Sequence, residues 1–167
     1  MIAYPLLLVF PVAMAFAAAN DLFTMKIPNK ISIVLVIAFC AAALATGMPW
    51  QTALLHAGVG AAALVFGFAL FSANLLGGGD AKLMAAGALW MGFDHVLPYL
   101  IYITFFGGML SLVILCYRRF VPAMNWPLPD WAHKLHASGT GIPYGLAIAA
   151  ASLVLYPATA WFKFLPA

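Results

Sequence analysis

Residues 52 to 83 read TALLHAGVGAAALVFGFALFSANLLGGGDAKL. Positions 52 to 75 contain no Asp, Glu, Lys or Arg, and they are long enough to cross the hydrocarbon of a bilayer, which takes about 20 helical residues. Three glycines and Asp80 then interrupt the apolar pattern before it resumes. This stretch predicts a transmembrane helix, a turn at the membrane surface, and a second helix that Asp80 opens.

The whole chain has the composition of an integral membrane protein. Of its 167 residues, 66% are hydrophobic and 7% are charged, and glutamate is absent. A soluble domain of this size needs a more charged surface, so we expect lipid to surround most of this chain. No internal repeat or linker divides it. We therefore predict an all-α polytopic membrane protein that forms one domain over residues 1–167.

Charges, glycines and prolines divide the apolar residues into six segments. They are residues 3–20, 30–46, 52–75, 81–93, 96–117 and 142–164. Most are long enough to span a bilayer, but the 13 residues of the fourth would rise only about 20 Å. This segment therefore crosses a locally thin or indented bilayer, or it is re-entrant and does not cross.

The basic residues decide between these two possibilities, because Lys and Arg collect in cytoplasmic loops. With six crossings and the N-terminus outside, only Lys163 lies on the outer side. The residues on the cytoplasmic side are then Lys26, Lys30, Lys82, Arg118, Arg119 and Lys134. We therefore expect about six transmembrane helices with both termini outside.

Two of the four aspartates lie at the ends of predicted membrane helices. Asp21 closes the first helix and Asp80 opens the fourth, so both emerge on the cytoplasmic face. A carboxylate at membrane depth costs about 2.5 to 3.5 kcal/mol on insertion scales and is a functional candidate by default. Two carboxylates in one site share a proton, and aspartic proteases use such a pair to activate water and polarise a peptide carbonyl.

Each aspartate alone also has a structural interpretation. Asp80 is suited to be the N-cap of the fourth helix, and Asp21 to be a polar residue at a helix end. A cap, however, requires no glycines. Gly77, Gly78 and Gly79 would let an extended peptide backbone lie against this turn without side-chain interference, which favours a protease site.

Three motifs in this chain resemble those of one enzyme family. GGGDAKL at 77–83 is similar to the GxGD motif of the prepilin peptidases, also called type IV leader peptidases, which are intramembrane aspartyl proteases. DLFTMKIPN at 21–29 resembles the segment that carries their first catalytic aspartate. GIPYG at 141–145 resembles the motif that opens their last helix. The resemblance implies that Asp21 and Asp80 are the catalytic residues.

The resemblance is closest to the short, peptidase-only form of Flp or Tad pilus systems. It implies a membrane aspartic endopeptidase of the bacterial inner membrane that removes the leader of Flp-like prepilins at the cytoplasmic face. Both termini would then be periplasmic. Longer relatives carry a cytoplasmic insert, commonly with paired CxxC motifs, and also methylate the product. This chain has neither feature, so we expect cleavage without methyl transfer.

Five further residues are expected to bind substrate or to shape the site. Lys82 resembles the lysine of the family motif and either reaches the membrane surface or acts on the two aspartates. Pro28 and Asn29 are expected to set the turn before the second helix, with Asn29 as its N-cap. Pro143 and Gly145 either shape the cavity beside the aspartates or simply begin the last helix.

The expected partners are the prepilin substrate and the lipid bilayer. The net charge of +3 belongs to the cytoplasmic loops, which leaves no basis for a nucleic-acid partner. No cofactor is expected. No metal is expected either, because His133 and His136 have only Asp130 nearby and the chain lacks the Glu of an HExxH motif.

Two other functions remain open from the sequence. A small proton-coupled transporter or channel subunit would use Asp21 and Asp80 as proton-carrying groups, since intramembrane aspartates also mark proton paths. Such transporters tend to show inverted repeats, and none is visible here. A purely structural membrane partner would tolerate replacement of both aspartates.

Overall fold

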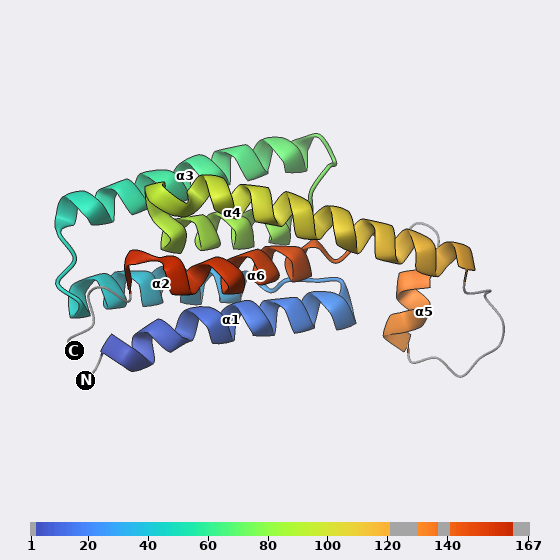
Figure 1. The fold of residues 1–167 in the computed structure, drawn as a ribbon, viewed down its shortest axis with the longest axis horizontal. Coiled ribbons are helices and arrows are strands. Elements are labelled where there is room, and N and C mark those ends of the chain that lie inside the picture. The colour runs from blue at the N-terminus through green and yellow to red at the C-terminus, as the bar shows by residue number, and fades with distance from the viewer. Residues whose placement is uncertain (1–2, 121–129, 137–140, 162–167) are drawn as a thin grey trace.

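The protein is built from helices. The computed structural model describes residues 3–120, 130–136 and 141–161. The helices are α1 (Ala3–Thr24), α2 (Asn29–Ala45), α3 (Trp50–Ser72), α4 (Gly78–Phe120), α5 (Asp130–His136), α6 (Tyr144–Leu155) and the short 3-10 helix η1 (Tyr156–Ala158). Figure 1 shows α1, α2, α3 and α6 running along one long axis, with the start of α1 and the end of α6 near the same end. The expected all-α class is confirmed.

Several helices have the length and composition of membrane spans. In the described part of the chain, three helices are long and apolar enough: Pro5–Thr24, Trp50–Ser72 and Gly78–Phe120. Two shorter apolar helices cover Asn29–Ala45 and Tyr144–Ala158. Large apolar side chains on α3, such as Val65 and Phe68, are exposed. An outer surface of this kind is compatible with lipid and not with water, so the membrane class is supported.

Helix α4 is two helices joined by a sharp reversal at Gly92. The φ of Gly92 is 69°, in the left-handed region that favours glycine. The Tyr99 hydroxyl donates a hydrogen bond to the Met84 carbonyl at 3.4 Å, although 15 residues of straight helix would separate them by about 22 Å. The two halves therefore lie side by side (Figure 1). They correspond to the expected segments 81–93 and 96–117.

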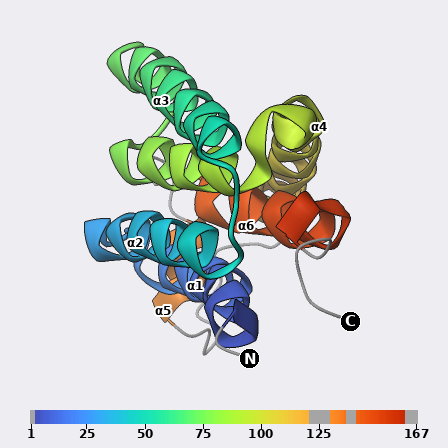
Figure 2. The ribbon, with the colours of Figure 1, turned by 90° about the vertical axis from the view of Figure 1, so that its left-hand side faces the viewer.

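The first half of α4 is the centre of the bundle. Figure 2 shows it between α3 on one side and α2 and α6 on the other. It is buried along most of its length, from Leu83 to Gly92. Small residues, such as Ala85, Ala86 and Gly87, allow these close approaches. A Cβ on Gly87 would overlap the Tyr99 hydroxyl, so the second half of α4 can pack closely only against a glycine here.

An aromatic cluster holds the bundle together at the end that contains Gly92. The Trp161 ring lies 5.0 Å from the ring of Trp90, and Phe10 lies at the same centroid distance from Trp90. The indole N–H groups of both tryptophans are hydrogen-bonded. Trp90 Nε1 donates to the Leu35 carbonyl and Trp161 Nε1 donates to the Trp90 carbonyl, both at 2.9 Å. Buried aromatic rings with paired N–H groups stabilise the fold, because the hydrogen bonds offset the cost of removing these groups from water.

The region after α4 contains a helix that none of the six predicted segments includes. Residues 130–136 form α5, which packs on the end of α4 (Figure 1). Tyr117 Oη donates to the Ala132 carbonyl at 3.4 Å, and Arg118 Nε donates to the Leu135 carbonyl at 2.7 Å. Apolar burial of Ala132 and Leu135 makes a helix favourable here. Lys163 and the end of segment 142–164 lie outside the described residues.

Candidate active site

The site lies at the end of the bundle opposite the aromatic cluster. Five helix termini meet there: the ends of α1 and α3 and the beginnings of α2, α4 and α6 (Figure 1). Asp21 stands in the last turn of α1, Asp80 in the first turn of α4, and Gly145 in the first turn of α6. Residues separated by up to 124 positions are thus brought to one place.

Asp21 is held in place by the start of α6. Its side chain is 5% exposed, and its Oδ2 accepts a hydrogen bond from the Gly145 amide at 2.7 Å. The first amides of a helix have no partner within the helix, so a carboxylate from another helix can accept from them. A Cβ on Gly145 would lie 2.8 Å from this Oδ2 and 2.6 Å from Ile27 Cδ1. The contact therefore requires glycine.

Pro143 and Gly145 combine the two roles that the sequence left open. Pro143 precedes α6 at its N-cap position and is fully buried. Its ring has no N–H group that would need a partner at the helix start. Gly145 follows two residues later and presents its amide to Asp21. The start of the last helix and the support of the carboxylate are thus one structural feature.

Asp80 is not the N-cap of its helix. Helix α4 begins at Gly78, and the Ala81 amide donates to the Gly77 carbonyl at 3.0 Å, which leaves Gly77 at the cap position. The Asp80 Oδ1 is buried and has no hydrogen-bond partner among the described residues. The capping interpretation is therefore wrong, and one carboxylate oxygen is left available for a ligand.

The two carboxylates line one cavity of about 370 Å³. Asp80 is close enough to Asp21 for their charges to interact. The backbone amides of Gly77 and Gly145 are near enough to Asp80 to favour its ionised form. The cavity wall comes from the α1 end, the α3–α4 connection and the start of α6. Its other lining residues are Met25, Phe71, Asn74, Leu75, Leu76, Gly77, Gly141, Ile142 and Tyr144.

The three glycines of the motif serve different contacts. Gly77 lines the cavity, and a Cβ there would lie 2.5 Å from Asp80 Oδ2. A Cβ on Gly78 would touch the ring of Phe71 at 3.4 Å. A Cβ on Gly79 would lie 3.1 Å from Ile27 Cβ and 3.3 Å from its carbonyl oxygen. Of the three, only Gly77 lines the cavity, and Gly79 allows close approach of Ile27 in the α1–α2 connection.

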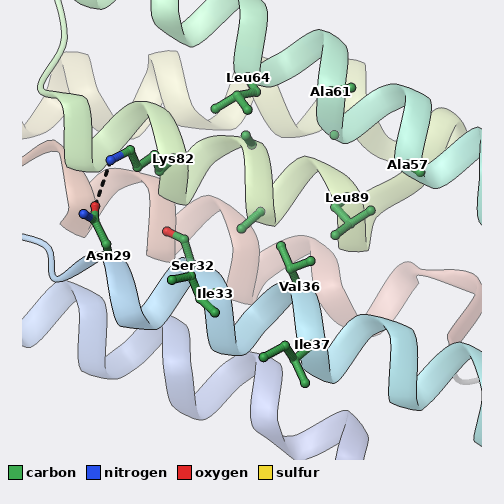
Figure 3. Close-up of a pocket in the computed structure, with 13 residues that line it drawn as sticks. Asn29, Ser32, Ile33, Val36, Ile37, Ala57, Ala61, Leu64, Lys82 and Leu89 are labelled. Atoms are coloured by element: carbon green, nitrogen blue, oxygen red, sulfur yellow. Dashed lines mark hydrogen bonds between the residues drawn. The ribbon is translucent and has the colours of Figure 1, made fainter.

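Lys82 and Asn29 contact each other on a different face of α4. Lys82 Nζ donates to Asn29 Oδ1 at 2.9 Å, as Figure 3 shows. The expected capping role of Asn29 is wrong, because α2 begins at Asn29 itself, with Pro28 in extended backbone at the cap position and no side-chain cap bond. The Asn29 side chain is directed to Lys82 instead. Neither residue lines the cavity of the two aspartates.

Sequence reasoning missed several cavity residues. Phe71, Asn74 and Tyr144 line the cavity but were not singled out. Tyr144 lies within the GIPYG motif and could have been found from it. Phe71 and Asn74 give no such signal, since their position depends on how α3 ends. Asn74 has a left-handed φ of 57°, which turns the chain toward the glycines.

The fold and the site define a helical membrane protein with two carboxylates from distant helices in one cavity. The comparison with protein families is consistent with this class: residues 8–115 match the type IV leader peptidase family. The chain belongs to this family of prepilin peptidases, and the resemblance noted from the motifs is confirmed. No curated protein and no solved structure matches the chain significantly.

The matched region includes both aspartates and the glycine motif but ends before α6. The GIPYG segment at 141–145 is therefore outside the family match. Its relation to the site comes from the fold, which places the Gly145 amide on Asp21.

Proposed function

We propose that this protein is an aspartic endopeptidase that removes the short leader of type IV, Flp-like prepilins at the cytoplasmic face of the bacterial inner membrane. One observation carries the proposal. Asp21 and Asp80 line the same cavity, and the buried Asp80 Oδ1 has no partner among the described residues. Membership of a leader peptidase family supports the reaction class.

The pair of carboxylates would work as one acid and one base. The ionised carboxylate takes a proton from a water molecule, whose oxygen bonds to the peptide carbonyl carbon. The protonated carboxyl donates its proton to the carbonyl oxygen. When the tetrahedral intermediate collapses, the C–N bond breaks and the leaving nitrogen receives a proton from the pair. The Gly145 amide keeps Asp21 oriented throughout.

The proposed topology has six crossings, with both termini periplasmic. The reversal at Gly92 supports it, since the two halves of α4 each cross the bilayer in this arrangement. The first half is short, rising about 21 Å, which brings Asp80 to the level of a peptide at the membrane surface. Lys26 and Lys30 flank the same end of the bundle and favour a cytoplasmic location for it.

An apolar groove continues from the cavity and would receive the hydrophobic N-terminal helix of the prepilin. It has a volume of about 450 Å³ and lies between α3, the second half of α4 and α6. Leu75, Leu76 and Tyr144 line both spaces. Gly108 on its wall has open space around it, because an added Cβ would meet nothing within 4 Å. The leader would then enter from the cytoplasm and the helix from the lipid.

Co-expression with a candidate Flp-type prepilin tests the function. Loss of the leader is followed by gel shift in membranes for wild type, Asp21→Asn and Asp80→Asn. Both substitutions keep the side-chain size and remove ionisation, so we expect both to abolish cleavage at unchanged protein level. Asp94→Asn is the matched control, because Asp94 is exposed and lies beside Gly92 at the other end. Cleavage that survives in either site variant would contradict the proposed pair.

A further inference from the structure

A second, larger groove lies on the face formed by α2, α3 and the first half of α4. Its volume is about 660 Å³, and neither aspartate lines it. Figure 3 shows Asn29 and Lys82 at one end and apolar side chains along the rest. The apolar wall consists of Ile33, Val36, Ile37, Ala57, Gly60, Ala61, Leu64, Ala85, Ala86 and Leu89.

The polar end of this groove carries a positive charge. Lys82 is exposed and donates one hydrogen bond, to Asn29 Oδ1 at 2.9 Å. An ammonium group has three donors, so the bond to Asn29 leaves capacity for an anionic group. This end of the bundle is also the end at which α1 stops and α2 begins, the level of the membrane surface in the proposed topology.

Ser32 lies one helical turn deeper and lacks a partner. The residue is 9% exposed, and its Oγ is buried with no hydrogen bond within the described ranges. A helical serine usually donates to the carbonyl four residues earlier, which would be Pro28, but no such bond is present here. An unpaired hydroxyl in apolar surroundings is costly. Ser32 is thus a donor that needs an acceptor from a ligand in the groove.

The apolar part of the groove suits a hydrocarbon chain. From Asn29 to Ile37 the α2 wall extends about 12 Å along the helix. On the opposite wall, Ala57 and Ala61 of α3 are small and exposed, and they leave room between the helices. From the surface inward, the groove therefore presents a cation, then a hydroxyl donor, then hydrocarbon.

We propose that this groove binds one anionic phospholipid. The phosphate contacts the Lys82 ammonium and the Asn29 amide, an ester carbonyl accepts from the Ser32 hydroxyl, and an acyl chain fills the apolar part. The order of these groups matches the order along a phospholipid.

Native mass spectrometry of the detergent-purified protein tests the head-group contact. The probes are phosphatidylglycerol and phosphatidylcholine with identical acyl chains. We expect wild type to retain one phosphatidylglycerol about tenfold more tightly, because the choline of phosphatidylcholine cancels the phosphate charge and repels the Lys82 ammonium. Lys82→Met should remove this preference, whereas Lys30→Met, an exposed lysine outside the groove, should retain it. Equal binding of both lipids by wild type would overturn the proposal.

A second pair of variants tests the location. Ala61 and Ala62 are neighbouring exposed residues on α3, but only Ala61 lines the groove. Ala61→Phe should lose bound lipid of both kinds, and Ala62→Phe should bind as wild type does. Unchanged lipid binding by Ala61→Phe would overturn the location. If Ala61→Phe instead disrupts a dimer, the groove binds a second copy of the chain. If it instead prevents prepilin cleavage, the groove binds the substrate. Lipid binding is measured without prepilin, so it stands or fails separately from proteolysis.

Discussion

At the residue scale, the site depends on the absence of a side chain at Gly145. This residue contacts Asp21 through its amide at 2.7 Å, and an added Cβ would collide with both Asp21 Oδ2 and Ile27 Cδ1. Hydrogen bonds to charged groups contribute about 1.5 to 3 kcal/mol, so displacing the amide would remove a substantial constraint on the Asp21 carboxylate. We expect Gly145 to act as a positioning residue for the proposed catalytic pair.

Substitution of Gly145 by alanine should slow cleavage about 10- to 100-fold, the rate equivalent of losing such a bond. The readout is the initial cleavage rate of purified protein, with thermal unfolding measured in parallel. Gly58→Ala is the control, because an added Cβ there meets nothing within 4 Å. A Gly145→Ala enzyme with wild-type kcat would show that the amide does not position Asp21.

Much of the site could be predicted from the sequence at this scale. Asp21 and Asp80 stood out because carboxylates are rare in so apolar a chain. Each follows an odd number of predicted membrane crossings, which places both on the same face of the membrane. The contact between Asn29 and Lys82 and the lack of a partner for Ser32 could not be predicted. Both features depend on which faces of α2 and α4 pack together. The residues next to Asn29 and Ser32 in the sequence do not reveal this packing.

At the element scale, Gly92 converts α4 into two antiparallel helices. Its φ of 69° is unfavourable for other residues, and a Cβ there would lie 2.5 Å from the His56 ring. His56 is itself held by its Nδ1 at 2.8 Å from the Leu89 carbonyl, so it has little freedom to move. The reversal is therefore fixed by both backbone and packing.

Gly92→Ala should destabilise the protein by about 2 to 4 kcal/mol, from left-handed strain and steric overlap together. Gly47→Ala is the comparison without steric overlap, because Gly47 also has a positive φ, 67°, but open space around it, and it should cost only about 1 kcal/mol. Thermal unfolding in detergent measures both. Equal losses for the two variants would contradict the extra strain and overlap assigned to Gly92.

The groove beside the cavity leads to a separate prediction for α3, α4 and α6. Gly108→Leu should raise KM about tenfold for a prepilin with its full hydrophobic helix, since one blocked apolar contact is worth roughly 1 to 3 kcal/mol. Cleavage of a short leader peptide without the helix should be unchanged. Leu112→Phe is the control, because Leu112 is exposed on the same helix outside the groove. Equal effects on both substrates would argue against docking here.

The elements themselves were largely predictable. Hydrophobic segments and their breaks gave α1, α2 and α3 within a few residues. Helix α5 was not predicted, because its seven residues carry a weak apolar pattern and fold against the end of α4. The expected last segment, 142–164, is longer than α6, which ends at Leu155 and continues as η1.

At the scale of the whole molecule, the bundle has a polar end and an aromatic end. Helix termini with Asp21, Asp80 and Lys82 gather at the first, and the Trp90 cluster closes the second. We expect the first end to face the cytoplasm. The class could be predicted from composition alone, but which helices are neighbours could not, since all the longer helices are mostly apolar in sequence.

Cysteine labelling in intact cells tests this orientation. In a background with Cys40 and Cys116 replaced by alanine, Asp94→Cys should react with a membrane-impermeant maleimide from outside. Lys26→Cys should react only after the inner membrane is permeabilised. Both positions are exposed in the structure, so accessibility depends on the side of the membrane. Outside labelling of Lys26→Cys would invert the proposed topology.

The most direct measurement of the central claim compares single and double variants of the aspartate pair. Purified wild type, Asp21→Asn, Asp80→Asn and the double variant are each incubated with one prepilin, and the mass of the product is followed over time. If the two carboxylates work as one unit, each single variant should lose at least about 1,000-fold in rate and the double variant should lose no more. Losses that multiply in the double variant, or a single variant that cleaves at near wild-type rate, would contradict a shared catalytic site.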